Sequence, residues 1–546
     1  MFISRNTSKH KSGKVYHSVL LRESYREGNK VKKRTIANLS KYPEALINSI
    51  ELALKGNVKK EVTKDEDLKL IQGKSIGSIY VLSTIAERLG ITRALGTDFH
   101  GQLALWLIMA RILEQGSRLS ATRLDSQYDL ASIIGLKRGF DENNLYESLH
   151  WLDSNQQKIE DALFNKKQTT KQFYWYDVTS SYFEGCYNEL AAFGYNRDKK
   201  TRKRIVVVGL LCQEEGNPVS IEAFKGNTQD TQTLENQLIK LKNRFDCQSI
   251  TVVSDRGLIR KKQKKLLTDY GFHYITALTM PEVLSLINAG KLNRSDFTHE
   301  LKSFSEIGVR YIYRCNAERA LKTQSQRQER LETAQRKTDQ ENVHLKAKPK
   351  GSALLAKKRI KKKLKTLCLH EWVDVKIVKR ELILSVDKAK LREKAVFDGC
   401  YIWTTDLEEN YATDREVYEQ YKNLKYVEND FRMFKTTFLK VRPIFVRTEE
   451  STRGHLLVVM LAHMIVRELR EAWKSINKTV REGLAELSLI CRHTIQFPNK
   501  EINCISSPAN SAEALLAALK IKMPTSIDQI HVPVVTRHKI RKTAKI

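Results

Sequence analysis

Paired cysteines, prolines and long apolar runs are all scarce in this sequence, and each scarcity excludes a class of protein. The eight cysteines are scattered without a Cys-x-x-Cys pair, which argues against a disulfide framework or a zinc module and favours a reducing compartment. The apolar run from Leu456 to Val466 is interrupted by His463 and is too short to cross a bilayer. The opening stretch MFISRNTSKHKSGK lacks the apolar segment of a secretory signal. Nine prolines and a hydrophobic content of 41% exclude general disorder.

Acidic residues are also few compared with basic ones. The 546 residues include 95 Lys and Arg against 63 Asp and Glu, a net charge of +32, which is usual for proteins that handle polyanions. Residues 1–62 carry 14 basic residues against five acidic ones, and residues 315–365 carry 16 against five. The stretch from Val534 onward has five basic residues and no acidic one. Such clusters bind phosphates without sequence preference, although a solvated helix face explains residues 315–365 equally well.

Residues 1–165 are predicted to be a strand pair followed by helices. Alternating apolar residues from Val15 to Leu21 indicate a strand, Glu27-Gly28-Asn29 a turn, and Lys30 to Ile36 a second strand. A helix is expected from Pro43, and the pattern from Gly77 to Asn165 is helical throughout. These later helices are expected to form a small, self-contained domain.

Strand patterns begin near Gln172 and indicate an α/β arrangement. An aromatic strand, a hairpin with a Gly-Asn-Pro turn, a helix, a buried strand, a helix and another strand follow in that order. The arrangement is expected to stop at about Met280, and residues 295–365 are not expected to continue it. Residues 317–365 are predicted to form an extended basic helical hairpin, after which strand-like sequence returns. A long helix is expected after Thr413 and an apolar one from Thr448.

Three acidic residues stand where chemistry is expected. Asp177 and Asp255 each end a predicted strand, and ligands gather at the carboxyl ends of strands in α/β sheets. Glu428 borders the apolar stripe of a predicted helix. Converging carboxylates could bind two divalent cations for in-line attack on a phosphodiester, and oxygen ligands favour Mg²⁺ or Mn²⁺ over zinc. From spacing alone, however, a strand-end Asp is more often a cap or turn residue, and Glu428 could simply pair with a lysine.

The residues around these acids are interpreted from their positions. Tyr421 and Lys435 lie seven residues to either side of Glu428, so all three are expected to project along nearly one line of the helix. The other acids near the predicted strands are interpreted as caps or loop contacts; they are Glu184, Asp198 and Asp230.

At these positions the sequence resembles a DDE transposase of bacterial insertion sequences. The relevant branch has the signature Y-(2)-R-(3)-E-(6)-K on its catalytic helix. This chain has Tyr421, Leu424, Glu428 and Lys435 at that spacing, with Leu424 in place of the usual Arg. The stretches YDVTSSYFEG, VVSDRGLI and GNPVSIEAFKGNTQDTQTL are also similar to the family, as are MFISR, VKKRTIANLS and ARILEQGSRLSATR nearer the N-terminus. The resemblance therefore covers most of the chain.

The resemblance implies an α/β fold with an RNase H-like catalytic core, a mixed sheet flanked by helices, which an insertion interrupts between the second Asp and the Glu. It implies binding to terminal inverted repeats, hydrolysis of a strand at each end and transfer of the freed 3′-OH to target DNA, with Mg²⁺ as cofactor and Mn²⁺ as a substitute. Asp177, Asp255 and Glu428 carry over as catalytic metal ligands, and Tyr421 and Lys435 as contacts to the terminal DNA. Further contacts to double-stranded DNA are expected at Lys32, Lys33, Arg34, Arg256, Lys361 and Lys362.

The chain is too long for one core, and we expect six segments. These are a basic β-hairpin and helix that bind DNA (1–70), a helical region that binds the DNA ends (71–165), the first part of the core (166–290), an insertion with a basic helical segment (291–394), the second part of the core with the glutamate helix (395–480), and a C-terminal helical region with a basic tail (481–546). We expect a homodimer in a synaptic complex, in the bacterial cytoplasm and associated with the nucleoid, without membrane contact.

Two other functions stay open from the sequence. A non-catalytic DNA-binding protein derived from a transposase would keep the basic clusters, but the presence of all three carboxylates argues against it. An RNase H-like nuclease would share the carboxylates, but the end-binding region and the long insertion favour transposition.

Overall fold

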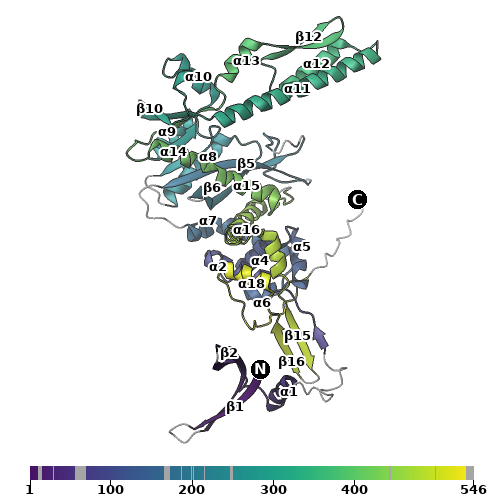
Figure 1. The fold of residues 1–546 in the computed structure, drawn as a ribbon. Helices are drawn as coiled ribbons and strands as arrows, with labels where there is room; N and C mark the ends of the chain where they lie inside the picture. The colour runs from purple at the N-terminus through teal and green to yellow at the C-terminus, as the bar shows by residue number, and fades with distance from the viewer. Residues whose placement is uncertain are drawn as a thin grey trace.

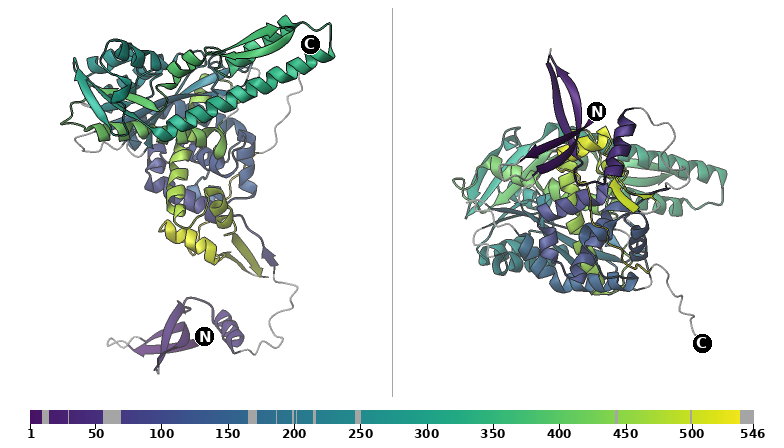
Figure 2. Two further views of the ribbon diagram at one scale, coloured as in Figure 1. Left: turned by 45° about the horizontal axis from the view of Figure 1, so that its top comes forward. Right: turned by 90° about the horizontal axis from the view of Figure 1, so that it is seen from below.

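The computed structural model is elongated, with a small N-terminal unit at one end, a helical insertion at the other, and a large sheet and a bundle of helices between them (Figure 1, Figure 2). Within the residues that it describes, every helix is too short or too polar to span a membrane. The described residues are 1–9, 15–28, 30–55, 69–164, 172–185, 187–197, 200, 202–213, 216–245, 250–441, 444–497 and 500–535.

The N-terminal unit is a three-stranded antiparallel sheet with one helix. Its strands are β1 (Phe2–Lys9), β2 (Val15–Glu27) and β3 (Lys30–Asn38), in that order, and its helix is α1 (Glu44–Leu54). The predicted strand pair corresponds to β2 and β3 and is confirmed, while β1 adds a third strand. Arg5 joins β1 to α1 through hydrogen bonds to Glu44, Asn48 and Glu51.

The helices that follow do not form a core of their own. Apolar residues of these helices belong to one continuous buried cluster with the apolar helix near the C-terminus and with part of the large sheet. The C-terminal helix that contains Gly454 packs closely on the helix that contains Leu149: a Cβ added to Gly454 would lie 2.1 Å from the backbone oxygen of Leu149. The expectation of a self-contained helical domain is therefore wrong, because its apolar faces are buried by segments near the other end of the chain. The helices are α2 (Gly77–Arg88), α3 (Ile91–Leu95), α4 (Phe99–Leu113), α5 (Arg118–Arg123), η2 (Leu124–Ser126), α6 (Leu130–Ile134) and α7 (Glu142–Leu163), and their C-terminal partners are α16 (Glu449–Lys474), α17 (Val480–Leu487) and α18 (Asn510–Ala518).

The C-terminal part also reaches back to the first residues of the helical region. Strand β15 (Arg492–Phe497) pairs antiparallel both with β16 (Lys500–Ile505) and with β4 (Lys69–Ile71). The three strands form a small separate sheet, which ties the chain segment before α2 to the segment after α17.

The large sheet has the predicted α/β order in its first half. Its hairpin strands are β5 (Phe173–Tyr182), β6 (Ile205–Gln213) and β7 (Asn217–Lys225), and its parallel strands are β8 (Thr251–Val253) and β9 (His273–Ala277). Helices α8 (Asp230–Asn243) and α9 (Lys261–Asp269) connect them. In space the order is β7-β6-β5-β8-β9, with β8 and β9 parallel to β5. This mixed sheet flanked by helices is an RNase H-like core.

The sequence predicts that the sheet stops near Met280, but the sheet continues beyond it. After α10 (Met280–Asn288) and η4 (Arg294–Asp296), the chain forms β10 (Lys302–Glu306) and β11 (Val309–Cys315). Strand β14 (Cys400–Thr405) inserts between β9 and β11, so the sheet grows to eight strands in the order β10-β11-β14-β9-β8-β5-β6-β7. Strands β10 and β11 pair with each other, but β14, the strand that joins β11 to the rest of the sheet, follows only after the whole helical insertion, so their place in the sheet escapes prediction.

The helical insertion leaves the sheet between β11 and β14. Helices α11 (Ala317–Ala347) and α12 (Ala353–Thr366) form the predicted hairpin, and the strands β12 (Val373–Val378) and β13 (Glu381–Val386) pack on it, followed by α13 (Lys388–Ala395). Figure 2 shows α11 extending away from the sheet. A small apolar core of its own holds the insertion together; it includes Ala334, Leu345, Ile360, Leu364, Trp372 and Val375.

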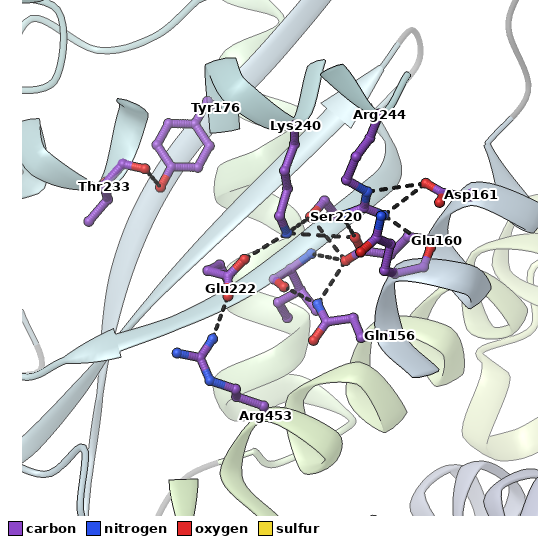
Figure 3. A network of polar contacts seen from close by, with 12 residues as sticks. Gln156, Glu160, Asp161, Tyr176, Ser220, Glu222, Thr233, Lys240, Arg244 and Arg453 are labelled. Carbon is purple, nitrogen blue, oxygen red and sulfur yellow. Dashed lines mark hydrogen bonds and ion pairs between the residues drawn. The ribbon is translucent and has the colours of Figure 1, made fainter. Parts of the chain in front are cut away.

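A buried ionic network connects α7 to the large sheet (Figure 3). Glu160, whose side chain is fully buried, accepts hydrogen bonds from Ser220 Oγ at 3.0 Å and from Arg244 Nη1 at 3.0 Å. Lys240 lies between Glu160 and Glu222, at 3.6 Å and 2.6 Å. Because a buried charge is costly unless it is paired and hydrogen-bonded, these contacts fix α7 on β7 and α8.

We expect Glu160→Gln to lower the free energy of unfolding by about 3 kcal/mol, because it removes the buried negative partner of the half-buried cations Arg244 and Lys240. Asp161→Asn is the matched control: Asp161 binds the same Arg244 but is 41% exposed, so the loss should stay below about 1 kcal/mol. Urea unfolding followed by circular dichroism measures both variants. Equal losses for the two would contradict a special role for the buried carboxylate.

Candidate active site

Asp177 and Asp255 come from adjacent parallel strands at matching positions. Trp175 of β5 pairs with Val253, the last residue of β8. Asp177 lies two residues further along β5, and Asp255 lies two residues beyond the end of β8. Ser254 Oγ donates a hydrogen bond of 2.6 Å to the Tyr176 backbone oxygen, which holds the two strands together at this point. The prediction that Asp177 ends its strand is wrong, because β5 continues to Tyr182 alongside β6. Asp177 lies instead where β8 ends and leaves β5 without a neighbour on that side.

Glu428 is presented by a short helix that packs on β5. The predicted long helix is divided into α14 (Asp414–Lys422), α15 (Leu424–Arg432) and the π-helical turn η5 (Met433–Thr437). The side chain of Glu428 is exposed at the edge of the buried stripe. The stripe is buried as predicted; its members are Leu424, Val427, Phe431, Phe434 and Phe438.

One cavity of about 550 Å³ brings the three carboxylates together. Asp177, Asp255 and Glu428 line it, and Lys435 of the π-helical turn lines it as well. The same three carboxylates also line an adjoining cavity of about 520 Å³ together with Tyr421. Four of the five residues that the sequence singles out around the catalytic helix thus share the first cavity, and the fifth faces the second.

The electrostatics of the site follow from burial and from like charge. Burial raises the pKa of Asp177 to about 7, and the neighbouring charges of Asp255 and Glu428 add to the shift. The hydrogen bond from the backbone N–H of Val178 and the positive charge of Arg197 act in the opposite direction. The Tyr421 hydroxyl donates a hydrogen bond of 3.1 Å to Asp255 Oδ1. Burial and the charge of Asp255 raise the pKa of Tyr421, so the phenol keeps its proton as the donor.

The donor set fits divalent cations. Three carboxylates on one cavity wall offer only oxygen ligands, which hard divalent cations prefer, and a bound cation would remove the repulsion that contributes to the raised pKa of Asp177. Among the described residues, no three His, Cys, Asp or Glu side chains lie close enough together to hold a metal as they stand.

The position of the missing arginine in the signature is occupied by an apolar contact. Leu424 is 8% exposed and belongs to the buried stripe of α15. Two guanidinium groups from outside the helix, Arg314 of β11 and Arg319 of α11, line the adjoining cavity beside Tyr421. Positive charge is therefore present there even though the helix does not supply it.

The other predicted DNA contacts lie away from the carboxylates. Arg256 directly follows Asp255 and is exposed, but it lines a different cavity at the base of the insertion. Lys32, Lys33 and Arg34 are exposed on β3 of the N-terminal unit, and Lys361 and Lys362 are exposed on α12. Three of these cations have acidic neighbours: Lys32 pairs with Glu27, Arg34 Nη2 lies 2.7 Å from Glu23, and Lys361 Nζ lies 3.4 Å from Asp374.

The sequence analysis missed two residues of the cavity wall that bring an aromatic ring and a positive charge. Tyr195 and Arg197, from the loop between β5 and β6, line the cavity together with Asp230. Arg197 pairs with Asp230, the first residue of α8, so the interpretation of Asp230 as a loop contact is confirmed. A usable signal was present in the stretch YNRDKKTRKR, where several basic residues follow shortly after an aromatic one.

Comparisons with known proteins show the family of the chain. Residues 168–465 match the family described as the transposase DDE domain, and residues 3–67 match the N-terminal domain of the IS1634 family transposases. No curated protein matches the chain. A solved structure of the piggyBac transposase synaptic complex with hairpin DNA is similar at 10% sequence identity over 72% of each chain, and its TM-score of 0.36 is too low to support an argument.

The raised pKa of Asp177 predicts an unusual pH dependence of stability. Because the folded state binds this proton more tightly than the unfolded chain does, the stability that this group contributes falls as the pH rises from 3.8, its ordinary pKa, to about 7. At pH 8 without metal, Asp177→Asn should therefore raise the free energy of unfolding by about 1–3 kcal/mol, and at pH 4 it should change little. Thermal unfolding at both pH values in a chelating buffer measures the effect.

Glu419→Gln, in the exposed part of α14, is the control and should be neutral at both pH values. A destabilisation by Asp177→Asn at pH 8 would show that the carboxylate is a structural hydrogen-bond partner rather than a strained anion.

Proposed function

This chain belongs to the DDE transposases of insertion sequences, and on that premise we propose that it binds terminal inverted repeats, cleaves a strand at each element end and joins the freed 3′-OH to target DNA. Its family makes it a DNA-binding enzyme that depends on divalent metal. The observation that supports the proposed chemistry most directly is the shared cavity of Asp177, Asp255 and Glu428, which come from two strands and one helix.

The three carboxylates act together as the metal-holding group. Asp177 would give up its proton if cations neutralised the cavity, and the hydroxyl of Tyr421 orients Asp255. Glu428 completes the set from the exposed edge of α15. We propose Mg²⁺ as the physiological ion, with Mn²⁺ as a substitute. When bound, a pair of such ions polarises the scissile phosphodiester and activates the attacking oxygen.

The cationic residues near the carboxylates position the DNA. Lys435 lines the cavity and offers an ammonium group to a phosphate oxygen near the scissile bond. Tyr421 faces the adjoining cavity with Arg314 and Arg319, so the terminal DNA is expected to pass along this side of the site. Phosphate contacts of this kind fix register and orientation and carry no sequence information.

The basic ends of the molecule extend the DNA contacts beyond one active site. The N-terminal unit with Lys32, Lys33 and Arg34 and the insertion with Lys361 and Lys362 lie at opposite ends of the elongated chain (Figure 1). The N-terminal unit and the insertion can therefore contact separate segments of DNA. We propose that two copies of the chain pair two element ends, the N-terminal unit recognising an end and the insertion binding phosphates across the dimer.

We expect Glu428→Gln to reduce strand cleavage and joining by at least about 100-fold, because losing several kcal/mol of transition-state stabilisation corresponds to at least two factors of ten. Size and helix propensity barely change, so folding and binding to element-end DNA should persist. The measurement is cleavage in Mg²⁺ of a labelled duplex taken from the DNA that flanks the gene. Asp177→Asn and Asp255→Asn should behave alike, and combining all three should add little.

Glu419→Gln is the matched control, since this glutamate is exposed on the preceding helix α14 and pairs only with Arg415 in the described contacts. Asp430, on the opposite side of α15, is unsuitable as a control, because it is buried and its Oδ1 lies 2.8 Å from Nε2 of the fully buried His463. Replacing it would disturb the fold. Near-normal cleavage by Glu428→Gln would remove this residue from the site and contradict the mechanism.

The insertion provides a second test. Lys358, Lys362 and Lys365 are exposed along one side of α12, and replacing all three by Gln should leave the fold intact while weakening the assembly of paired ends. Because each lost phosphate contact reduces the salt slope of binding by about one, gel-shift titrations at several salt concentrations should show a shallower slope. An unchanged slope together with reduced solubility would support a merely solvated helix face.

A further inference from the structure

The loop between β5 and β6 leaves large aromatic side chains in solvent beside the active site. Tyr195 is 81% exposed, Phe193 66% and Tyr187 55%. Most aromatic side chains of this size are largely buried, and a group of exposed ones usually marks a binding surface. Tyr195 lines the same cavity as Asp177, Asp255 and Glu428.

The loop is held in place rather than hanging free. Ala192 pairs with Ile205 through two backbone hydrogen bonds, and the backbone N–H of Arg197 donates to Ser180 Oγ at 2.9 Å. Gly194 packs so closely on Gly226 that an added Cβ would lie 1.9 Å from the Gly226 oxygen. The aromatic rings are therefore displayed at fixed positions relative to β5, which carries Asp177.

Cations accompany these rings. Arg197 lies 5.7 Å from the centre of the Tyr195 ring, and Arg204 lies 5.9 Å from that of Phe193. In sequence, residues 195–204 contain six basic residues and a single acidic one. Aromatic faces interleaved with positive charge are the combination that binds unpaired nucleic acid, because every base can stack and every phosphate is attracted.

We propose that this loop is a stacking platform for unpaired DNA bases beside the scissile phosphate, with Tyr195 as its central ring. The proposal rests on the proposed function, since it takes DNA in the carboxylate cavity as its starting point. A duplex alone cannot use the platform, because its bases are stacked on one another. The platform therefore selects DNA that is opened near the cleavage position and holds the unstacked strand while the phosphate enters the cavity.

The test uses the full-length protein with Glu428→Gln, so that DNA is bound without being cut. The probe is a forked duplex whose single-stranded arm carries the fluorescent base 2-aminopurine, whose emission falls when it stacks. Binding should quench the emission several-fold, Tyr195→Ala should abolish most of this quenching, and Tyr195→Phe should retain it. Tyr146→Ala, an exposed aromatic residue of α7, is the control and should leave it unchanged.

Quenching that is unaffected by Tyr195→Ala and by Phe193→Ala would overturn the platform. Affinity for a fully paired duplex should change less than twofold in either variant, and an equal loss for paired and forked DNA would also contradict it. Quenching that depends on Tyr195, in a protein whose unmutated form cuts no DNA, would support the platform and count against the proposed function instead.

A second, independent observation concerns two cysteines at the neck of the insertion. Cys315 ends β11 and Cys400 begins β14, and the two are directly opposite partners in the antiparallel pairing. Their Sγ atoms lie 3.7 Å and 3.9 Å from the same backbone oxygen, that of Asp398. Directly opposite residues of antiparallel strands have Cα atoms about 4.5–5.5 Å apart, within the range that a disulfide can bridge.

We propose that this pair is a modification site at which a peroxide forms a reversible disulfide. Arg294 Nη2 lies 3.8 Å from Cys315 Sγ, so Cys315 is taken as the sulfur that reacts first. This sulfur attacks one peroxide oxygen, the O–O bond breaks, and water and a sulfenic acid result. The Cys400 sulfur then attacks the Cys315 sulfur, and the hydroxyl group leaves as a second water with the Cys400 proton. Two thiols and one hydrogen peroxide thus give one disulfide and two waters, and the bond joins the two ends of the insertion.

Full-length protein treated with hydrogen peroxide, alkylated and digested should yield a Cys315–Cys400 linked peptide by mass spectrometry, lost after dithiothreitol. Limited proteolysis within the insertion should leave the fragments joined until reduction. Cys315→Ser and Cys400→Ser should each abolish the link, whereas Cys504→Ser should not. Oxidation of the exposed Cys368 without any link between Cys315 and Cys400 would overturn the proposal.

Discussion

The parallel pairing of β5 with β8 is the constraint on which the site depends. Strand β8 has only three residues, all buried, and its pairing with β5 places Asp255 level with Asp177. If the register slipped by one residue, one aspartate would face the opposite side of the sheet. The hydrogen bond from Ser254 to the Tyr176 backbone oxygen secures this register at the edge of the cavity.

The catalytic helix depends on that sheet in turn. Helix α15 has to bury its apolar stripe against β5, and this requirement leaves Glu428 at the exposed edge facing the aspartates. The change to a π-helical turn at Met433–Thr437 ends the regular α-helical spacing before Lys435, yet Lys435 still lines the cavity. Like charge in this confined space adds to the burial that brings the pKa of Asp177 near neutrality before any cation binds.

Long-range pairing gives the molecule its continuity around the site. Strand β14 returns from the insertion to pair with both β9 and β11, so the insertion enters and leaves the core at one place. On the other side, Glu160 of α7 joins the N-terminal helices to β7 and α8. Helices α2 to α7 and the catalytic core are therefore one packed body, joined at a buried ionic network as well as by apolar contacts.

The sequence by itself determined the local elements and singled out the three carboxylates that line one cavity. The alternation in β2 and β3, the α/β order from Gln172 to Ala277 and the stripe of α15 are all visible as periodic patterns, because burial on one face forces that period. The seven-residue spacing of Tyr421, Glu428 and Lys435 can also be read directly from the sequence. Only the tertiary structure decided that β10 and β11 extend the sheet and that α16 shares the core of α4 and α7. It also decided that Tyr195 and Arg197 enter the cavity. Those outcomes depend on partners distant in sequence, and a local pattern reports that a face must be buried without reporting which segment will cover it.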